Sequence, residues 1–184
     1  MKKIQKLSLN EMVNQLQTVS EVELMAMIGG SDYKGTCFFD CLLSVMESKG
    51  LQGSRNDMLI SYGKTYIEID NPNMGYGQDA SYTNKDYRNH AEAGIQDYNN
   101  RIVDFANRYF EDAVLLSPGQ VATGQTNGHN YIILNVNLGQ DGIDHAVMYR
   151  GYDSGTGKFT VYDASSNTTY EVKNDQVKSA LGIK

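Results

Sequence analysis

The sequence has little cysteine, proline or histidine and no tryptophan: its 184 residues include two Cys, two Pro and three His. Two cysteines are too few for a disulfide framework. The four-residue spacing of Cys37 and Cys41 places them on one helical face, which is a poor geometry for an unstrained bridge. We therefore expect both cysteines to be thiols. The scarcity of proline beside 18 Gly indicates loops built with glycine rather than rigid linkers.

Basic residues are also in short supply, with 16 Lys and Arg against 22 Asp and Glu and a formal net charge of −6. A nucleic-acid-binding protein normally presents a basic face, so we expect no nucleic-acid partner. No hydrophobic run is long enough to insert in a membrane, and the apolar run at residues 24–28 is too short for the core of a secretory signal peptide. The spacing C-x₃-C without a nearby His does not make a zinc site, and the glycines are too isolated for a phosphate loop. We expect neither a metal nor a cofactor.

Residues 1–30 differ in pattern from the rest of the chain. Apolar residues recur there at helical spacing, Ser20 and Glu23 form a capping-box pattern, and Gly29 and Gly30 would end the helix. One interpretation is an amphipathic helix that docks on the following domain. The segment "VSEVELMAMIGG" also resembles the double-glycine leader of exported bacterial peptides. That resemblance implies cleavage after Gly30 by the peptidase domain of an ABC exporter. The protein would be cytoplasmic before leader removal and secreted or periplasmic after it.

The remaining residues, 31–184, predict helices first and strands afterwards. Helices are expected at residues 36–49, 55–67 and 93–110, with Gly50 closing the first. Short β-rich runs follow, separated by turn signals: "AVLLS", "NYIILNVN", "HAVMYRGYD", "KFTVYDA" and "TYEVK". A last short helix is expected at residues 174–182, capped by Asn174. This order predicts one α+β domain with its N-terminal helices packed on a C-terminal antiparallel sheet.

Three residues have the types and positions that an activated thiol requires. Cys37 is expected in the first turn of a helix, where exposed N–H groups and the helix dipole stabilise a thiolate. His145 begins one strand and Asp163 ends the next. A hairpin between these strands places their opposite ends side by side, so Asp163 can orient the imidazole. The pattern predicts a nucleophile, a base and an orienting group.

Two blocks of the sequence resemble the papain-like cysteine peptidases. "GTCFFDCLLSVME" offers a small residue before Cys37 and an aromatic one after it, followed by a long helix. "DHAVMYRGYDSGTGKFTVYDASSNTTYEV" is similar to the His/Asp hairpin of the C39-like bacterial peptidases. The resemblance implies a papain-like fold and hydrolysis of a peptide or protein substrate. Cys37, His145 and Asp163 would be the catalytic residues.

The chain departs from this family just before the nucleophile. Papain-like enzymes usually carry a Gln about six residues upstream, where it helps to bind the oxyanion, and this chain has Ser31 there. The backbone N–H of Cys37 would still serve, with the side chain of Ser31 or Tyr33 as a second donor. Loss of one good donor typically costs ~10²–10³ in rate. The departure therefore predicts either an altered oxyanion hole or a reduced activity.

Each candidate residue has a competitor or an alternative interpretation. Cys41, one turn inside the helix, is expected to be core packing. His129 in "NGHNY" is a rival base, whereas His90 belongs to a polar stretch. Asn167 is a rival to Asp163 as the orienting group.

The function also has alternatives. The same triad supports acyl transfer as well as hydrolysis. An exported toxin or binding protein on a degenerate peptidase-like fold would retain the leader and lack the Gln. The remaining alternative is a soluble domain that is not exported.

Overall fold

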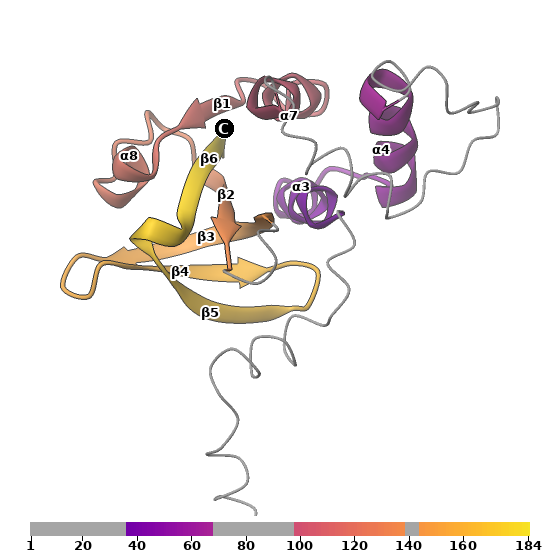
Figure 1. Ribbon diagram of the computed structural model, residues 1–184. Coiled ribbons are helices and arrows are strands. Elements are labelled where there is room, and N and C mark those ends of the chain that lie inside the picture. The colour runs from indigo at the N-terminus through magenta and orange to yellow at the C-terminus, as the bar shows by residue number, and fades with distance from the viewer. Residues whose placement is uncertain (1–35, 68–97, 139–143) are drawn as a thin grey trace, which may run out of the picture. The chain divides into compact units, whose positions relative to one another are not determined.

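Helices precede strands in the computed structural model of the protein, which describes residues 36–67, 98–138 and 144–184 (Figure 1). The helical elements are α3 (Cys37–Ser48), α4 (Arg55–Tyr62), the π-helical turn η1 (Gly63–Ile67), α7 (Tyr98–Ala106), α8 (Pro118–Ala122) and the 3₁₀ turn η3 (Asn174–Gln176). The strands are β1 (Val114–Leu116), β2 (Tyr131–Asn137), β3 (Asp144–Asp153), β4 (Lys158–Asp163), β5 (Thr168–Lys173) and β6 (Val177–Ile183). The predicted α+β class is confirmed, and α3, α4 and α7 precede the strands as expected, although α8 and η3 lie between strands.

The helix α3 begins and ends close to the residues that the sequence indicates. Its N-terminal turn starts with the carbonyl of Thr36, which accepts from the N–H groups of Phe39 and Asp40 at 3.0 and 3.3 Å. Its C-terminus is closed by Gly50, whose φ of +68° is readily adopted only without a side chain. The N–H of Gly50 donates to the carbonyl of Glu47 at 3.0 Å. Cys37 is therefore the first residue of a well-defined helix.

All six strands form one antiparallel sheet in the order β1-β6-β2-β3-β4-β5. The hairpin of β3 and β4 turns at residues 154–157, as the glycine-rich "DSGTGK" predicts, and Gly157 has a φ of +68° there. In the same hairpin Met148 pairs with Tyr162. This pairing brings the beginning of β3 close to the end of β4.

The predicted C-terminal helix at residues 174–182 is wrong. Only Asn174–Gln176 form a single 3₁₀ turn, and Val177–Ile183 form the strand β6. This strand pairs with β1 on one side and with β2 on the other, so both of its edges have backbone partners. Ala180, Leu181 and Ile183 are fully buried between these neighbours. Pairing and burial on this scale outweigh the modest intrinsic helix preference of Ala and Leu.

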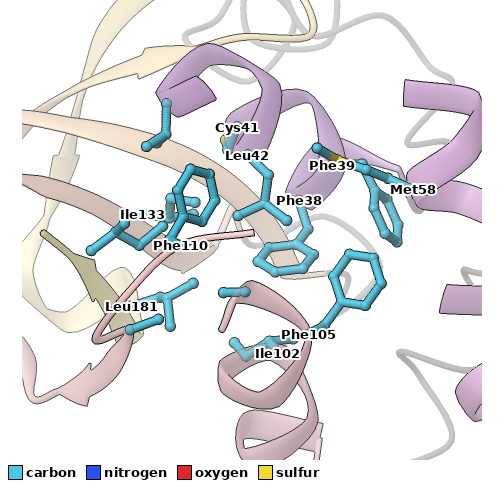
Figure 2. Packing of buried hydrophobic residues seen from close by; sticks show 14 of the residues in the cluster. Phe38, Phe39, Cys41, Leu42, Met58, Ile102, Phe105, Phe110, Ile133 and Leu181 are labelled. Carbon is cyan, nitrogen blue, oxygen red and sulfur yellow. The ribbon is translucent and has the colours of Figure 1, made fainter. Parts of the chain in front are cut away.

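The two faces of the sheet carry separate apolar clusters. On the face toward the helices, Ile133 and Leu181 contact residues of α3 and α7, as Figure 2 shows. Phe105 of α7 is fully buried there, and its ring centroid lies 5.8 Å from that of Phe39 and 5.2 Å from that of Tyr62. The strand residues that point to the opposite face form a second apolar cluster. It includes Leu134, Val147, Phe159 and Val161. The helices α3, α4 and α7 thus pack on one face of the sheet, with α3 against β3, whereas Val121 of α8 belongs to the cluster on the opposite face.

Within the described segments, no helix combines the length and the apolar character that crossing a bilayer would require.

Candidate active site

The sulfur of Cys37 lies against the beginning of β3. Cys37 is half-buried and is the first residue of α3, so its side chain sits where the N–H groups of the first helical turn point outward. The backbone N–H of Ala146 donates to Sγ of Cys37 at 3.3 Å, across 109 residues of sequence. A donor at the sulfur and a helix N-terminus both stabilise negative charge on it.

The ring of His145 is held from one side by Asp163. His145 is the residue before Ala146 in β3 and is buried. Its Nε2 lies 2.9 Å from Oδ2 of Asp163, the last residue of β4. The hairpin thus brings His145 beside Asp163, as the spacing in the sequence predicts.

Both oxygens of the Asp163 carboxylate have donors. Oδ2 faces His145, while Oδ1 accepts from the N–H groups of Ser165 at 2.8 Å and Ser166 at 3.4 Å. Burial raises the pKa of Asp163, but the hydrogen bond and positive charge of His145, helped by the Ser165 N–H, lower it below its usual value. Asp163 is therefore an ionised carboxylate with a fixed orientation.

The pKa of His145 is raised to about 10 by its neighbours. Burial alone would lower it, because it penalises the charged ring, but hydrogen bonds with Asp163 and Cys37 and the charges of both raise it by more. His145 is thus an imidazolium at neutral pH, between a carboxylate and a sulfur. An imidazolium beside a thiol group is the arrangement that activates cysteine for attack on an acyl carbon.

Cys41 has a different environment from Cys37. It is fully buried, and its Sγ donates to the carbonyl of Ala146 at 3.5 Å. Burial, followed by the charges of Cys37 and Asp163, raises the pKa of Cys41 well above its ordinary value, so this residue stays a thiol. The prediction that Cys41 belongs to the core is confirmed. The two cysteines together take both backbone polar groups of Ala146, one sulfur accepting and the other donating.

The rival residues are engaged elsewhere. The ring of His129 is buried, with Nδ1 2.6 Å from the carbonyl oxygen of Thr126 and Nε2 3.0 Å from that of Asp112. Asn167 accepts a hydrogen bond from the hydroxyl of Tyr162 at 3.0 Å. His129 therefore ties two loops together, and Asp163, not Asn167, faces His145.

A polar group around Asp40 was not predicted from the sequence. The guanidinium of Arg55 donates to Asp40 and to Thr36, and the hydroxyl of Ser165 donates to the second oxygen of Asp40. Arg55 is 15 residues from Asp40, and Ser165 is 125 residues from it. The only signal in the sequence is the position of Asp40 in the turn that begins with Cys37.

Several predicted residues lie outside the part of the chain that the structure describes. These are His90, the cleavage-site residues Gly29 and Gly30, and the suggested oxyanion donors Ser31 and Tyr33. Among the described residues, no group of three or more His, Cys, Asp and Glu side chains is arranged to hold a metal ion.

The residues of this site offer a thiol at a helix N-terminus, a protonated imidazole and a fixed carboxylate. Compared with known proteins, the chain matches no family model, no curated protein and no solved structure.

Proposed function

We propose that the chain is an exported thiol hydrolase, a cysteine peptidase of the papain-like, C39-like type. Cys37 is the nucleophile, His145 the general acid and base, and Asp163 the group that orients His145. The observation that carries this proposal is the convergence of all three at the start of β3, where Sγ of Cys37 lies 3.3 Å from the N of Ala146 and the adjacent His145 lies 2.9 Å from Asp163. A helix bearing the nucleophile and an antiparallel hairpin bearing the base also agree with a papain-like fold.

Acylation begins with the Cys37 thiolate beside the His145 imidazolium. Sγ attacks the carbonyl carbon of a peptide bond, and the electron pair of the C=O bond moves to the oxygen. When the C=O bond re-forms, the C–N bond breaks and His145 gives its proton to the departing amine. Asp163 faces Nε2, so Nδ1 is the nitrogen that exchanges this proton. The acyl part of the substrate remains on Cys37 as a thioester.

Deacylation uses the same residues, but His145 now begins as a base instead of an acid. His145, now neutral, accepts a proton from a water molecule as the water oxygen attacks the thioester carbon. The C–S bond then breaks, which releases the carboxylic acid and restores the thiolate beside an imidazolium. Asp163 keeps the ring in one orientation through both steps and stabilises its charged form.

The oxyanion of each tetrahedral intermediate needs a donor near Cys37. The backbone N–H of Cys37 is suited to this, because the first N–H groups of a helix have no acceptor within the helix. Ser31 or Tyr33 supplies the second donor in place of the usual Gln. We expect the single change Ser31→Gln to raise the rate of hydrolysis, and an unchanged rate would contradict the assignment of Ser31 to the Gln position.

Export is the second part of the proposal. Residues 1–30 form a double-glycine leader that the peptidase domain of an ABC exporter removes after Gly30. Mass spectrometry of the protein from culture medium tests this: a chain that begins at Ser31 supports it. An intact chain found only inside the cells contradicts it.

Peptide cleavage is tested with a library of peptides whose fragments are identified by mass spectrometry. We expect cleavage by the parent protein and its loss, by about 10³-fold or more, in Cys37→Ala. Cys41→Ala removes a thiol from the same helix and is expected to keep the activity, because Cys41 is a buried thiol that faces a carbonyl. Cleavage that persists in Cys37→Ala would contradict the proposal. Products that form only when an amine acceptor is added would show acyl transfer in place of hydrolysis.

A further inference from the structure

Arg55 contacts the turn of α3 that carries Cys37 at two points. Its Nε donates to Oδ1 of Asp40 at 2.5 Å, and its Nη2 donates to the hydroxyl of Thr36 at 2.6 Å. Thr36 directly precedes Cys37, and Asp40 follows it by three residues. One guanidinium group therefore holds the helical turn on both sides of the nucleophile.

The position of Arg55 is itself fixed by the start of α4. Arg55 is the first residue of that helix, and the preceding Ser54 is its N-cap. The hydroxyl of Ser54 accepts from the N–H of Asp57 at 3.3 Å, which stabilises the first turn of α4. The guanidinium thus extends from an ordered helix end.

The second oxygen of Asp40 connects this turn to the other half of the site. It accepts from the hydroxyl of Ser165 at 2.9 Å, and the backbone N–H of Ser165 donates to Asp163 at 2.8 Å. Asp163 in turn holds His145. A continuous series of hydrogen bonds therefore runs from Arg55 through Asp40, Ser165 and Asp163 to the imidazole.

The hydrogen bonds of Arg55 with Asp40 and Thr36 are strong enough to hold the turn that carries Cys37 in place. The side chains of Asp40 and Arg55 are 16% and 39% exposed, so the pair is only partly screened by water. Hydrogen bonds in which a partner is ionised are roughly twice as strong as neutral ones. The planar guanidinium contacts Asp40 and Thr36 at once, which a lysine ammonium on a flexible stem would not reproduce.

Resting on the function proposed above, we infer that Arg55 and Asp40 are a positioning pair, which sets the Cys37 turn at the correct place relative to His145 and Asp163. Neither residue is a catalytic residue, since the pair acts through Thr36 and Ser165. Without Arg55, the carboxylate of Asp40 lacks its cation and the turn that carries Cys37 lacks its link to α4. The thiol then meets the imidazole less often in the reactive geometry.

The test is the alkylation rate of Cys37 with iodoacetamide at pH 6, which needs no substrate. We expect Arg55→Gln to slow this rate about tenfold and Arg55→Lys to recover part of the loss. Ser165→Ala, which removes only the link to Asp40, is expected to slow it about threefold. The matched control is Arg108→Gln: Arg108 is also 39% exposed and also contacts one Asp, Asp104, and one Thr, Thr65.

Melting temperatures separate positioning from a loss of stability. Arg55→Gln and Arg108→Gln are expected to lower the melting temperature to a similar small extent, with slower alkylation in Arg55→Gln alone. Alkylation of folded Arg55→Gln at the parent rate would overturn the inference. If Arg55→Gln does not fold, the parent rate in Arg55→Lys and in Ser165→Ala would overturn it equally.

Measuring peptide cleavage beside Cys37 alkylation separates this inference from the proposed function. If no peptide is cleaved but Cys37 alkylation is fast and depends on both His145 and Arg55, the positioning inference stands and the peptidase proposal fails. If His145→Gln leaves alkylation unchanged while Arg55→Gln slows it, the inference fails as stated, because Arg55 would then act without the imidazole.

Discussion

Nε2 of His145 and Oδ2 of Asp163 lie 2.9 Å apart although 18 residues separate them in the sequence. Both side chains are buried, and the carboxylate has further donors in the loop that follows β4. A buried ion pair of this kind stays favourable only when its remaining polar atoms are satisfied as well. The contact decides which protonation state His145 has next to Cys37, and the first predictions follow from it.

Replacing Asp163 with Asn should lower the pKa of His145 from its raised value of about 10. Asn removes the negative charge and the carboxylate hydrogen bond that raise this pKa, while the desolvation that lowers it remains. NMR titration of the ring protons measures the pKa, with His145→Gln used to assign the signal among the three His. We expect peptide hydrolysis to fall by about 10²–10⁴ as well. A His145 pKa equal to that of the parent protein would contradict the assigned role of Asp163.

The contribution of a protonated His145 to the stability of the fold should decrease as the pH rises above 6.5. The pKa of His145 rises on folding from its ordinary 6.5 to about 10, so the folded state keeps a proton that the unfolded chain releases between these values. The stabilisation is therefore complete below pH 6.5 and is lost on the way to pH 10, with a slope of at most about 1.4 kcal/mol per pH unit.

Urea unfolding at pH 6.5, 7.5 and 8.5 measures this slope. The comparison is made in Cys37→Ala, where no proton passes from Cys37 to His145 and Asp163 still raises the pKa of His145. It is the free energy of unfolding of Cys37→Ala minus that of the double variant Cys37→Ala/His145→Gln, which cancels other groups. The pKa of Asp163 is lowered on folding, so its contribution is present above its unfolded pKa near 4 and is lost only as the pH falls through that range. A difference that stays constant from pH 6.5 to 8.5 would show that His145 is not held as an imidazolium.

The two cysteines should differ in accessibility. Cys37 is half-buried and Cys41 is fully buried, with its Sγ facing the carbonyl of Ala146. Brief treatment of the native protein with iodoacetamide at pH 8 is expected to add one carbamidomethyl group, mapped to Cys37, and two after unfolding in urea. Modification of Cys41 at the same rate as Cys37 in the native protein would mean that α3 does not pack as described.

Gly182 is a position where β6 approaches its neighbours too closely for a side chain. A Cβ atom there would lie 2.8 Å from Cδ1 of Leu116 and 3.0 Å from Cβ of the buried His129. We expect Gly182→Ala to lower the free energy of unfolding by about 1–3 kcal/mol. Gly151→Ala is the control, because nothing lies within 4 Å of its Cβ position, and its effect should stay within about 0.5 kcal/mol. Equal effects in urea unfolding would contradict the close packing of Gly182 against Leu116 and His129.

The local part of the fold could be predicted from the sequence. The turn "DSGTGK" and its two flanking strands determine a hairpin, and the hairpin alone brings His145 to Asp163. The start of α3 at Cys37 and its end before Gly50 follow from equally local signals. These predictions depend on residues close together in the chain, or on one turn that joins them.

The features that depend on distant packing could not be predicted in this way. The segment at residues 177–183 is a strand because β1 and β2 lie on either side of it, and the modest helix preference of its Lys, Ala and Leu residues does not decide its structure. The Arg55–Asp40 contact requires α4 to pack beside α3, which no periodicity indicates. The proximity of Cys37 to the hairpin was inferred from residue types and from the resemblance to papain-like enzymes, and no local signal places Cys37 next to Ala146, which is 109 residues away.

The central claim is that His145 and Asp163 activate Cys37, and the alkylation rate of Cys37 at pH 6 tests it most directly. An ordinary cysteine is less than ~1% thiolate at this pH, since its pKa is about 8.5. We expect native Cys37 to react with iodoacetamide about a hundredfold faster than the same residue in the urea-unfolded chain, and His145→Gln to abolish this advantage. Equal rates in the native and unfolded chains, or a fast rate that survives in His145→Gln, would contradict the account.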